Sequence, residues 1–338
     1  MFRDSLNKII QGINLGEREI AEIITDIFSG NATDAQIGGL MAALATKGET
    51  FEELAGAAQA MRKKAVRIHT ASKTVVDTCG TGGDSANTFN ISTTTAFVVA
   101  GCDVTVAKHG NRSVSSKCGS ADVLETLGIK LDTPPEIVEE AISEIGIGFL
   151  FAPKYHGAMK YAINARKELG IRSIFNMLGP LTNPAAANCQ LIGVYAPELT
   201  EMFAQALNLL GAKRAYVVHG HDGLDEISIC APTRISELDD GMITTYDLNP
   251  ELYFEALADP FDLSGGDATQ NAAITKGILN GDRGPKRDIV LINAAFALMA
   301  ARKAETPQDG ISLAKTSIDS GAATDKLEKL IRFTQDNG

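Results

Sequence analysis

The stretch TVVDTCGTGGDSANTFNIST, residues 74–93, contains the change of pattern that decides the fold. Its first five residues form a β-branched run typical of a strand, and the run ends in the glycine-rich segment CGTGGD. A helical pattern follows over roughly 91–101, and DVTVAK, 103–108, predicts a second strand. A second loop then leads into SADVLETLG, 120–128, which opens another helix. The sequence therefore predicts a β-α-β unit with a glycine-rich loop after each strand.

The chain before this unit is predicted to be helical. Apolar residues recur near helical spacing in GEREIAEIITDIFSG, ATDAQIGGLMAALAT and TFEELAGAAQAMRKKA. Thr33 and Thr50 are suitable N-caps, and Gln36 and Glu53, three residues later, complete two candidate capping boxes. We therefore expect an all-helical domain over residues 1–70.

Strands and helices continue to alternate after the unit. Three further apolar runs predict strands: FLFAP (149–153), QLIGVY (190–195) and AYVVHG (215–220). YHGAMKYAINARKELG, 155–170, predicts one helix that ends at Gly170, and the C-terminal third contains apolar helices. The expected fold is α/β, with a small all-helical domain and a larger α/β domain over residues 71–338. The central sheet should be mostly parallel.

Composition and charge narrow the class of protein. The 42 acidic residues outnumber the 31 basic ones and give a net charge of −11, which argues against nucleic acid as the main partner. The five cysteines form no C-x-x-C pair, which favours a reducing, cytoplasmic setting over a disulfide framework. The first residues lack the apolar core of a signal peptide, and no apolar run approaches the ~18 residues of a membrane span. We therefore expect a cytoplasmic protein.

The first glycine-rich loop is a candidate ligand site. Ligands of open α/β sheets bind beyond the carboxyl ends of the strands, where this loop lies. Gly80, Gly82 and Gly83 let the backbone approach a ligand closely, and the helix that starts near Asn90 attracts anions with its N-terminus. The P-loop motif is absent, and GTGGDS lacks the third glycine of a dinucleotide fingerprint. A plain turn remains the alternative.

The second loop adds positive charge beside the first. Lys108, His109, Arg112 and Lys117 lie among glycines and serines in AKHGNRSVSSKCGS, 107–120. Cations and hydroxyl donors of this kind suit phosphate oxygens, although a solvated basic turn is the alternative. Because both loops should face one crevice, the sequence predicts a ligand with two separated phosphate groups.

Adjacent carboxylates suggest a metal site. Asp225 and Glu226 lie in HGHDGLDEISI, which overlaps the end of a predicted strand. Magnesium is often held by one or two carboxylates together with substrate phosphates, although paired acids are also common on surfaces. His219 and His221 lie nearby, but a zinc site would need further ligands at suitable spacing.

Three segments carry a resemblance to a known family. GTGGD at 80–84, FNIST at 89–93 and KHGNRSVSSKCGSADVLE at 108–125 resemble the anthranilate phosphoribosyltransferase family, and the resemblance extends over nearly the whole chain. It implies transfer of a phosphoribosyl group from 5-phosphoribosyl-1-pyrophosphate to anthranilate, with Mg²⁺ as cofactor. It also implies a nucleoside phosphorylase-like (class III phosphoribosyltransferase-like) fold and a homodimer formed through the N-terminal helices. Part of 155–185 is expected to join the helical domain.

The resemblance assigns roles to individual residues. It implies the following donor-binding set: Gly80, Gly83, Asp84, Thr88, Asn90, Ile91, Ser92, Thr93, Lys108, His109, Gly110, Asn111, Arg112, Ser113, Val114, Ser115, Ser116 and Ser120. Anthranilate would meet Gly80, Asn111 and Arg166, and reach them past Ala152, His156 and Met159. Magnesium would be held by Ser92, Asp225 and Glu226. No general base is evident, and His109 would contact or orient anthranilate.

Two rival functions remain open at this point. A pyrimidine nucleoside phosphorylase-like enzyme would share the fold but have different loop sequences. A non-catalytic, nucleic-acid-binding paralogue would need a basic surface and eroded GTGGD and Asp-Glu motifs, neither of which this sequence has. The stretch SGGDATQNA, 264–272, imitates a phosphate loop, and we expect it to be a helix cap.

Overall fold

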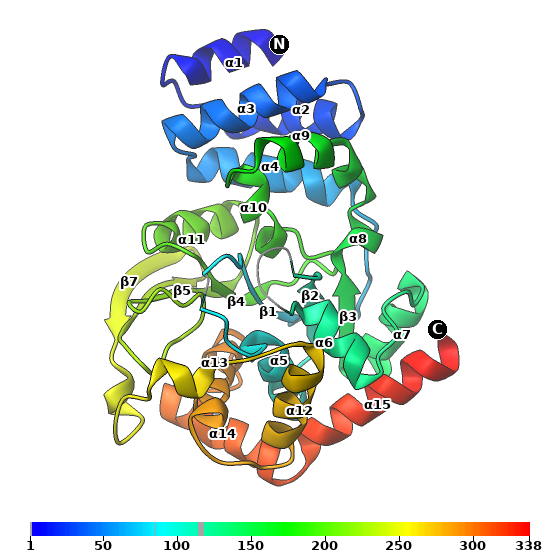
Figure 1. The fold of residues 1–338 in the computed structure, drawn as a ribbon, viewed down its shortest axis with the longest axis vertical. Helices are drawn as coiled ribbons and strands as arrows, with labels where there is room; N and C mark the ends of the chain where they lie inside the picture. Colours follow the sequence, from blue (N-terminus) through cyan, green and yellow to red (C-terminus); the bar gives the residue numbers. More distant parts are fainter. Residues whose placement is uncertain (1, 85, 114–117) are drawn as a thin grey trace.

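The computed structural model describes residues 2–84, 86–113 and 118–338. Four residues of the second loop that the sequence singles out, Val114, Ser115, Ser116 and Lys117, lie outside the described residues. Within the described ranges, seven strands form one sheet in the order β3-β2-β1-β4-β5-β6-β7 (Figure 1). The strands are β1 Val76–Gly80, β2 Val106–Gly110, β3 Ile147–Phe151, β4 Cys189–Gly193, β5 Arg214–Gly220, β6 Thr233–Asp239 and β7 Met242–Leu248.

The sheet is parallel from β3 to β5, which confirms the predicted α/β class. The last two strands are antiparallel and form a hairpin that was not predicted. Its two-residue turn is Asp240-Gly241, with φ angles of 45° and 91°. A turn with positive φ at both central residues matches the twist of the flanking strands, and Asp-Gly is suited to it.

Helices cover both faces of the sheet (Figure 1). Those of the α/β part are α5 Ile91–Gly101, α6 Ser120–Leu127, α7 Pro135–Glu144, α11 Leu199–Leu209, α12 Ala268–Leu279, α13 Pro285–Ala300, α14 Pro307–Asp319 and α15 Ala322–Asn337. Alternating side chains of β5 illustrate the two faces. Tyr216 joins the apolar cluster of α5 and α13, with its ring centroid 5.1 Å from that of Phe296. Val217 joins the opposite cluster, which contains Phe203 of α11.

A helical bundle stands above the sheet in Figure 1. It contains α1 Phe2–Ile10, α2 Glu17–Phe28, α3 Asp34–Lys47 and α4 Phe51–Lys64. Both predicted capping boxes are present, at the N-termini of α3 and α4. A later helix, α9 Ile163–Leu169, packs against α3, and its Ala165 shares a buried cluster with Ile20 and Leu40. The domain boundary at residue 70 stays a prediction.

The single helix predicted over 155–170 is wrong. The segment contains α8 Ala152–Tyr155, a 3-10 helix Gly157–Tyr161 and then α9. His156 interrupts it with φ −112° and ψ 48°, outside the helical region. The predicted end is confirmed, because Gly170 takes a left-handed conformation with φ 62°. The strand predicted over 149–153 is displaced, since β3 ends at Phe151 and α8 begins with Ala152 and Pro153.

The helix cap predicted at SGGDATQNA is confirmed. Asp267 caps α12, and its side chain accepts a hydrogen bond from the N–H of Gln270. Within the described part of the chain, no helix is both long and apolar enough to cross a membrane. All five cysteines are described, and none forms a disulfide.

Candidate functional site

The candidate site lies where the strand order reverses. The chain runs outward from β1 to β2 and β3 on one side, and β4 and β5 follow on the other side of β1. In open α/β sheets the crevice beyond the carboxyl ends at such a point is the usual ligand site. The two strands that meet there end in Gly80 and Gly193, which are paired in register.

Asp225 packs directly against these two glycines. A Cβ atom on Gly80 would overlap the Asp225 carboxylate, and a Cβ on Gly193 would overlap the Asp225 carbonyl oxygen. The N–H of Gly82 donates to Oδ2 of Asp225 at 2.9 Å. Gly82 has φ 67°, in the region that favours glycine. Glycines therefore bring the first loop and the predicted metal carboxylate into contact.

Glu226 lies beside the start of α5. Its Oε1 accepts a 3.0 Å hydrogen bond from the N–H of Ser92, and its side chain is buried. Burial raises the pKa of Glu226 to about 8, and the positive charge of Lys108 opposes that rise. The pKa of Asp225 is raised well above its ordinary value by burial and by the carboxylates of Asp84 and Glu226. Three acids therefore crowd one place, in which Glu226 is buried and Asp84 and Asp225 are half-buried.

A divalent cation would relieve this crowding. Ser92, Asp225 and Glu226, predicted to hold magnesium, supply only oxygen donors, which Mg²⁺ prefers. Among the described residues, no group of three or more His, Cys, Asp or Glu converges as a complete metal site. The donor set fits an ion that takes its remaining ligands from water and substrate phosphates, as Mg²⁺ commonly does.

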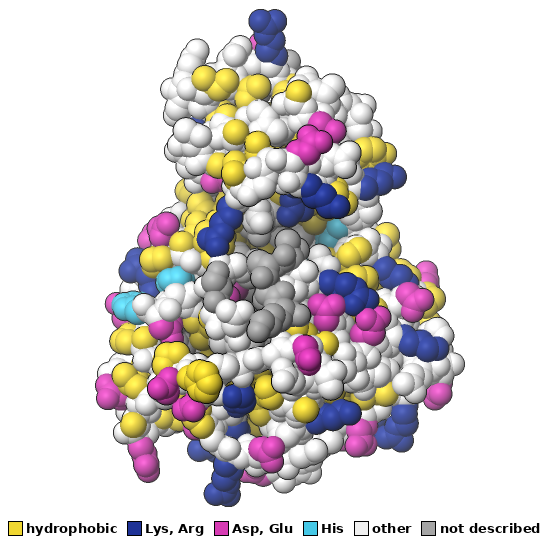
Figure 2. Space-filling view, viewed as in Figure 1, with side chains coloured by type: hydrophobic (Ala, Val, Ile, Leu, Met, Phe, Trp, Pro, Cys, Tyr) yellow, Lys and Arg dark blue, Asp and Glu magenta, His cyan; other side chains and the backbone are white. Residues whose placement is uncertain are grey.

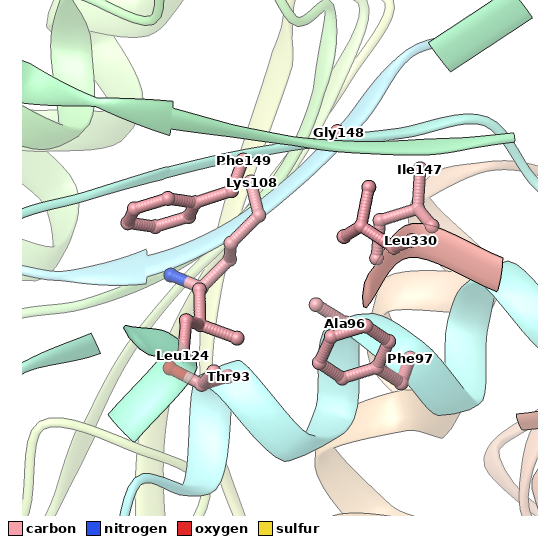
Figure 3. A pocket seen from close by; sticks show the side chains of 9 residues that line it. All are labelled: Thr93, Ala96, Phe97, Lys108, Leu124, Ile147, Gly148, Phe149 and Leu330. Carbon is pink, nitrogen blue, oxygen red and sulfur yellow. The ribbon is translucent and has the colours of Figure 1, made fainter. Parts of the chain in front are cut away.

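Lys108 supplies the buried positive charge of the site. It lies in β2 with 3% of its surface exposed, and its Nζ donates to the carbonyl oxygen of His109 at 3.1 Å. Figure 3 shows its side chain extending from the strand toward Thr93 of α5 and Leu124 of α6, along a small cavity. Buried ammonium groups need nearby acceptors or negative charge, which Glu226 and Asp77 provide.

Asp77 is a functional candidate that the sequence analysis missed. This fully buried acid of β1 accepts from the N–H of His109 at 3.0 Å and from Nδ2 of Asn183 at 2.8 Å. Burial raises the pKa of Asp77, and Lys108 and these hydrogen bonds oppose the rise. The signal was present in the sequence, since a carboxylate inside the β-branched run TVVDT calls for buried partners.

The rings of His109 and His156 share a hydrogen bond. Nδ1 of His109 lies 3.1 Å from the carbonyl oxygen of Gly179, and the two Nε2 atoms are 3.3 Å apart. A carbonyl only accepts, so Nδ1 of His109 carries hydrogen, and His156 must donate from its own Nε2. Burial lowers the pKa of His109 well below its ordinary value, and His156 and Lys108 lower it further. In a neutral His109, the lone pair on Nε2 therefore already accepts a hydrogen bond from His156.

Arg112 of the second loop is engaged with acids of α6. Its NH1 lies 2.8 Å from Asp122 and 2.8 Å from Glu125. Asp122 also accepts from the N–H groups of Ser113 and Gly119, at 3.2 and 2.8 Å, on either side of the undescribed residues. Asp122 therefore closes the base of the loop, and the contact of Arg112 with phosphate stays a prediction.

The other predicted donor-site residues line the same two loops. Ile91 and Thr93 are buried at the start of α5, and Asn90 precedes that helix at the N-cap position without a capping bond from its side chain. Gly110 ends β2 so close to the first residue of α6, Ser120, that a Cβ atom would press on its Oγ. Asn111 lies in the described part of the second loop, and its Oδ1 accepts from the N–H of Arg112 at 2.8 Å.

Arg166, the predicted acceptor residue, belongs to a different part of the chain from these loops. It is on α9, and its guanidinium carbon is 6.0 Å from the ring centroid of Phe175. Burial lowers its pKa. Ala152 and His156 lie in and just after α8, and Met159 is in the following 3-10 helix. Among the described contacts, none joins Arg166 to Gly80 or Asn111, so a shared acceptor site stays a prediction.

Arg172 connects these two regions and was not predicted. It follows α9, and its NH2 donates to the carbonyl oxygen of Gly83 at 2.5 Å. Its guanidinium carbon also lies 4.4 Å from the ring centroid of Tyr195, which follows β4. Figure 2 shows Lys and Arg side chains gathered at the waist between the helical bundle and the α/β part. Arg172 thus links the segment after α9 to the glycine-rich loop at Gly83.

Comparisons with known proteins agree with this geometry. Residues 3–65 match a family model described as "Glycosyl transferase family, helical bundle domain", and residues 72–324 match "Glycosyl transferase family, a/b domain". The anthranilate phosphoribosyltransferase of Desulfosudis oleivorans is 69% identical over 339 residues, covering 100% of both chains.

Solved structures give the same result. The crystal structure of anthranilate phosphoribosyltransferase from Thermus thermophilus is 41% identical with a TM-score of 0.93, covering 98% of this chain and 99% of that one. The enzyme from Saccharomyces cerevisiae, in complex with PRPP and Mg, is 27% identical with a TM-score of 0.90, covering 99% and 98%. With these similarities over its full length, the chain belongs to the anthranilate phosphoribosyltransferase family.

Proposed function

We propose that this protein transfers the 5-phosphoribosyl group of 5-phosphoribosyl-1-pyrophosphate to the amine of anthranilate, in tryptophan biosynthesis. The products are N-(5-phosphoribosyl)anthranilate and pyrophosphate. The observation that carries the proposal is the packing of Asp225 against Gly80 and Gly193 at the reversal of strand order. It joins the glycine loop and the acidic pair in one crevice, as a magnesium-bound pyrophosphate requires.

Different residues of the chain would bind the magnesium ion and the phosphates of the donor. We assign magnesium to Ser92, Asp225 and Glu226, and when bound the ion would neutralise charge on the departing pyrophosphate. Lys108 and the N–H groups at the start of α5 would attract the donor's negative charge. The glycines of the first loop would let its backbone approach the phosphates closely.

Anthranilate needs orientation more than activation. Its amine is a neutral nucleophile, and positive charge develops on the ribose as the C1–O bond breaks. We assign its carboxylate to Arg166, whose planar guanidinium suits a carboxylate. For His109 we favour orientation over proton transfer, because its Nδ1–H is bonded to Gly179 and its lone pair faces His156. Approach of the bundle to the α/β part would exclude water from the activated sugar.

The setting and assembly are proposed on separate grounds. Five cysteines without a disulfide support a reducing, cytoplasmic compartment. Exposed apolar side chains at Ile10 and Ile13, on and just after α1, support a homodimer formed through the N-terminal helices. Light scattering of the purified protein and of Ile10→Lys tests the dimer. A wild-type monomer would contradict it.

Anthranilate fluorescence tests the proposed reaction. The purified protein is mixed with anthranilate, donor and Mg²⁺, and consumption of anthranilate should change the signal at a rate proportional to protein. Parallel samples lack the donor or contain a chelator in place of Mg²⁺, and neither should react. An unchanged signal in the complete mixture would overturn the proposal.

The same preparation separates the rival functions. A pyrimidine nucleoside phosphorylase would release free base from uridine or thymidine with inorganic phosphate, and we expect no release. A nucleic-acid-binding paralogue would bind labelled oligonucleotides with an affinity that falls steeply with salt, and we expect no binding at physiological salt.

A further inference from the structure

Asn271 of α12 has a buried side chain whose two ends are both engaged. It is 1% exposed, and its Nδ2 donates to Oδ1 of Asn90 at 2.9 Å. Its own Oδ1 accepts from the N–H of Gly266 at 2.7 Å. Since a backbone N–H only donates, the amide of Asn271 can have only this orientation, with its donor toward Asn90.

The bond from Asn271 also fixes the orientation of the Asn90 side chain, which in turn contacts the second loop. Because its Oδ1 faces the donor of Asn271, its Nδ2 must point the other way, and it donates to the carbonyl oxygen of Cys118 at 3.2 Å. Asn90 also begins α5, since its own carbonyl accepts from the N–H of Thr94 at 3.0 Å. The Asn271–Asn90–Cys118 chain therefore joins three segments that are far apart in the sequence.

Residues 263–266, which precede α12, pack against residues 87–89 at the end of the first loop. The N–H of Phe89 donates to Leu263 at 3.2 Å, and the N–H of Gly265 donates to Asn87 at 3.0 Å. A Cβ atom on Gly265 would meet the backbone nitrogen of Phe89 at 2.6 Å, so only glycine allows this approach. The start of α12 is thus a fixed support for residues 87–90.

We infer that Asn271 is a positioning residue of the donor site, which holds the start of α5 and the Cys118 end of the second loop in register through Asn90. The inference rests on the proposed function for its effect on the donor. Asn271 touches no predicted substrate group, so it acts through Asn90, whose side chain it fixes, and through the thiol of Cys118, with which it also shares a hydrogen bond. Loss of the chain would let the two loops move independently and would weaken binding of the two-phosphate donor.

Two substitutions separate the hydrogen bond from the space it fills. Asn271→Leu keeps the branched shape but removes the hydrogen bonds, and Asn271→Ala removes both. The matched control is Thr275→Val, which deletes a buried 2.9 Å hydrogen bond from α12 to Thr94 of α5 without touching Asn90. All three should lose thermal stability, so stability alone does not report the positioning role.

Steady-state kinetics measures the effect on the donor. Both Asn271 variants should raise the KM for 5-phosphoribosyl-1-pyrophosphate about tenfold, about what the loss of one or two buried hydrogen bonds predicts. The KM for anthranilate and both KM values of Thr275→Val should change less than about twofold. Equal KM values for the donor in the Asn271 variants and the control would overturn the role in donor binding.

Alkylation of Cys118 measures loop position without any catalysis. Each protein is treated with iodoacetamide, and modification of Cys118 is compared with that of buried Cys102 by peptide mass spectrometry. Both Asn271 variants should raise the Cys118-to-Cys102 ratio several-fold over wild type and Thr275→Val. Asn90→Ala, which keeps the direct contact between Asn271 and the Cys118 thiol but breaks the bond to the Cys118 carbonyl, should raise it as well. An unchanged ratio in Asn90→Ala overturns the inference. Failure of the wild-type protein to form product overturns the proposed function instead, and the ratio still decides whether Asn271 holds the loop.

Discussion

The N–H of Ser92 donates a 3.0 Å hydrogen bond to Glu226, joining segments 134 residues apart. This bond orients the carboxylate at the N-terminus of α5, where the dipole of the helix and the charge of Lys108 favour negative charge. The first turn of α5 and the acidic pair therefore belong to one structural unit. That unit is where the proposed magnesium ion would lie.

Glu226→Gln tests this unit. The amide oxygen can still accept from Ser92, but the negative charge is lost, so binding of Mg²⁺ should weaken by about tenfold or more. Magnesium titrations of activity and of pyrophosphate binding by calorimetry measure the change. Asp247→Asn, at an exposed acid of β7, is the control and should titrate like wild type. Identical titrations for Glu226→Gln and wild type would refute the assignment.

Gly193→Ala should disturb Asp225 without touching any substrate. The new Cβ would overlap the Asp225 carbonyl, so the variant should lose about 1–3 kcal/mol of unfolding free energy and bind Mg²⁺ more weakly. Denaturant unfolding and the same titration measure both effects. Gly157→Ala is the matched control, because a Cβ there meets nothing within 4 Å. If both variants behaved alike, the packing argument would fail.

Glu125→Gln should weaken the hold of α6 on Arg112, which keeps its ion pair with Asp122, and so make Arg112 more available to the donor. Arg112 pairs with Glu125 on the protein surface, and such pairs are weak enough to exchange for phosphate. The KM for the donor should therefore fall by about twofold to fivefold at low salt. Arg112→Ala should raise that KM and abolish the effect of Glu125→Gln in the double variant. An unaltered effect in the double variant would show that Arg112 is not involved.

Arg166→Ala should act mainly on the acceptor. Its guanidinium is partly buried and is the proposed partner of the anthranilate carboxylate, so the KM for anthranilate should rise about tenfold or more. The KM for the donor should change little. Lys167→Ala, at the exposed neighbour on α9, controls for the helix and should leave both values unchanged. Equal increases in the two KM values of Arg166→Ala would contradict the assignment of Arg166 to the anthranilate carboxylate.

The buried histidine pair should make stability depend on pH. Burial lowers the pKa of His156 from its ordinary 6.5 to about 4. Between these values the unfolded chain binds a proton at His156 that the folded protein does not, so the contribution of His156 to the unfolding free energy should fall as pH falls from 6.5 to 4. Glu226, whose pKa is raised to about 8, contributes a slope of the opposite sign, which is the same in wild type and in a His156 variant. The slope is about 1.4 kcal/mol per pH unit for one group. His109, whose pKa is also lowered, adds to it.

Denaturant unfolding at several pH values between 5 and 7 measures this slope. His156→Gln can still donate to Nε2 of His109 but does not titrate, so its slope should be smaller than that of wild type. His69→Gln, at an exposed histidine, should retain the wild-type slope. A His156→Gln slope equal to that of wild type would contradict the expectation.

Local patterns predicted much of the fold. The β-α-β unit, the two capping boxes and the cap of α12 each depend on residues within a few positions of one another. The β6–β7 hairpin also had a local signal, the Asp-Gly turn at 240–241, which the sequence analysis overlooked. The broken helix at 155–163 had weaker signals, because the helical spacing continues through the break at His156.

Contacts across long stretches of chain were beyond the sequence patterns. Arg172 reaches Gly83 over 89 positions, Asn183 reaches Asp77 over 106, and Asn271 reaches Asn90 over 181. A single sequence gives no periodicity that links such positions. The residues predicted from motifs lie on two loops and one acidic pair, while the residues that support them come from distant parts of the chain.

The packing of α9 against α3 has a consequence for biosynthesis. The bundle's early helices end at Lys64, but Ile163 begins the helix that covers α3, about 100 residues later. At synthesis rates of roughly 5–20 residues per second, this delay lasts about 5 to 20 s. During that time the apolar surface of the nascent N-terminal helices would remain uncovered on the ribosome. Completion of the bundle therefore has to wait until three strands of the sheet have already been made.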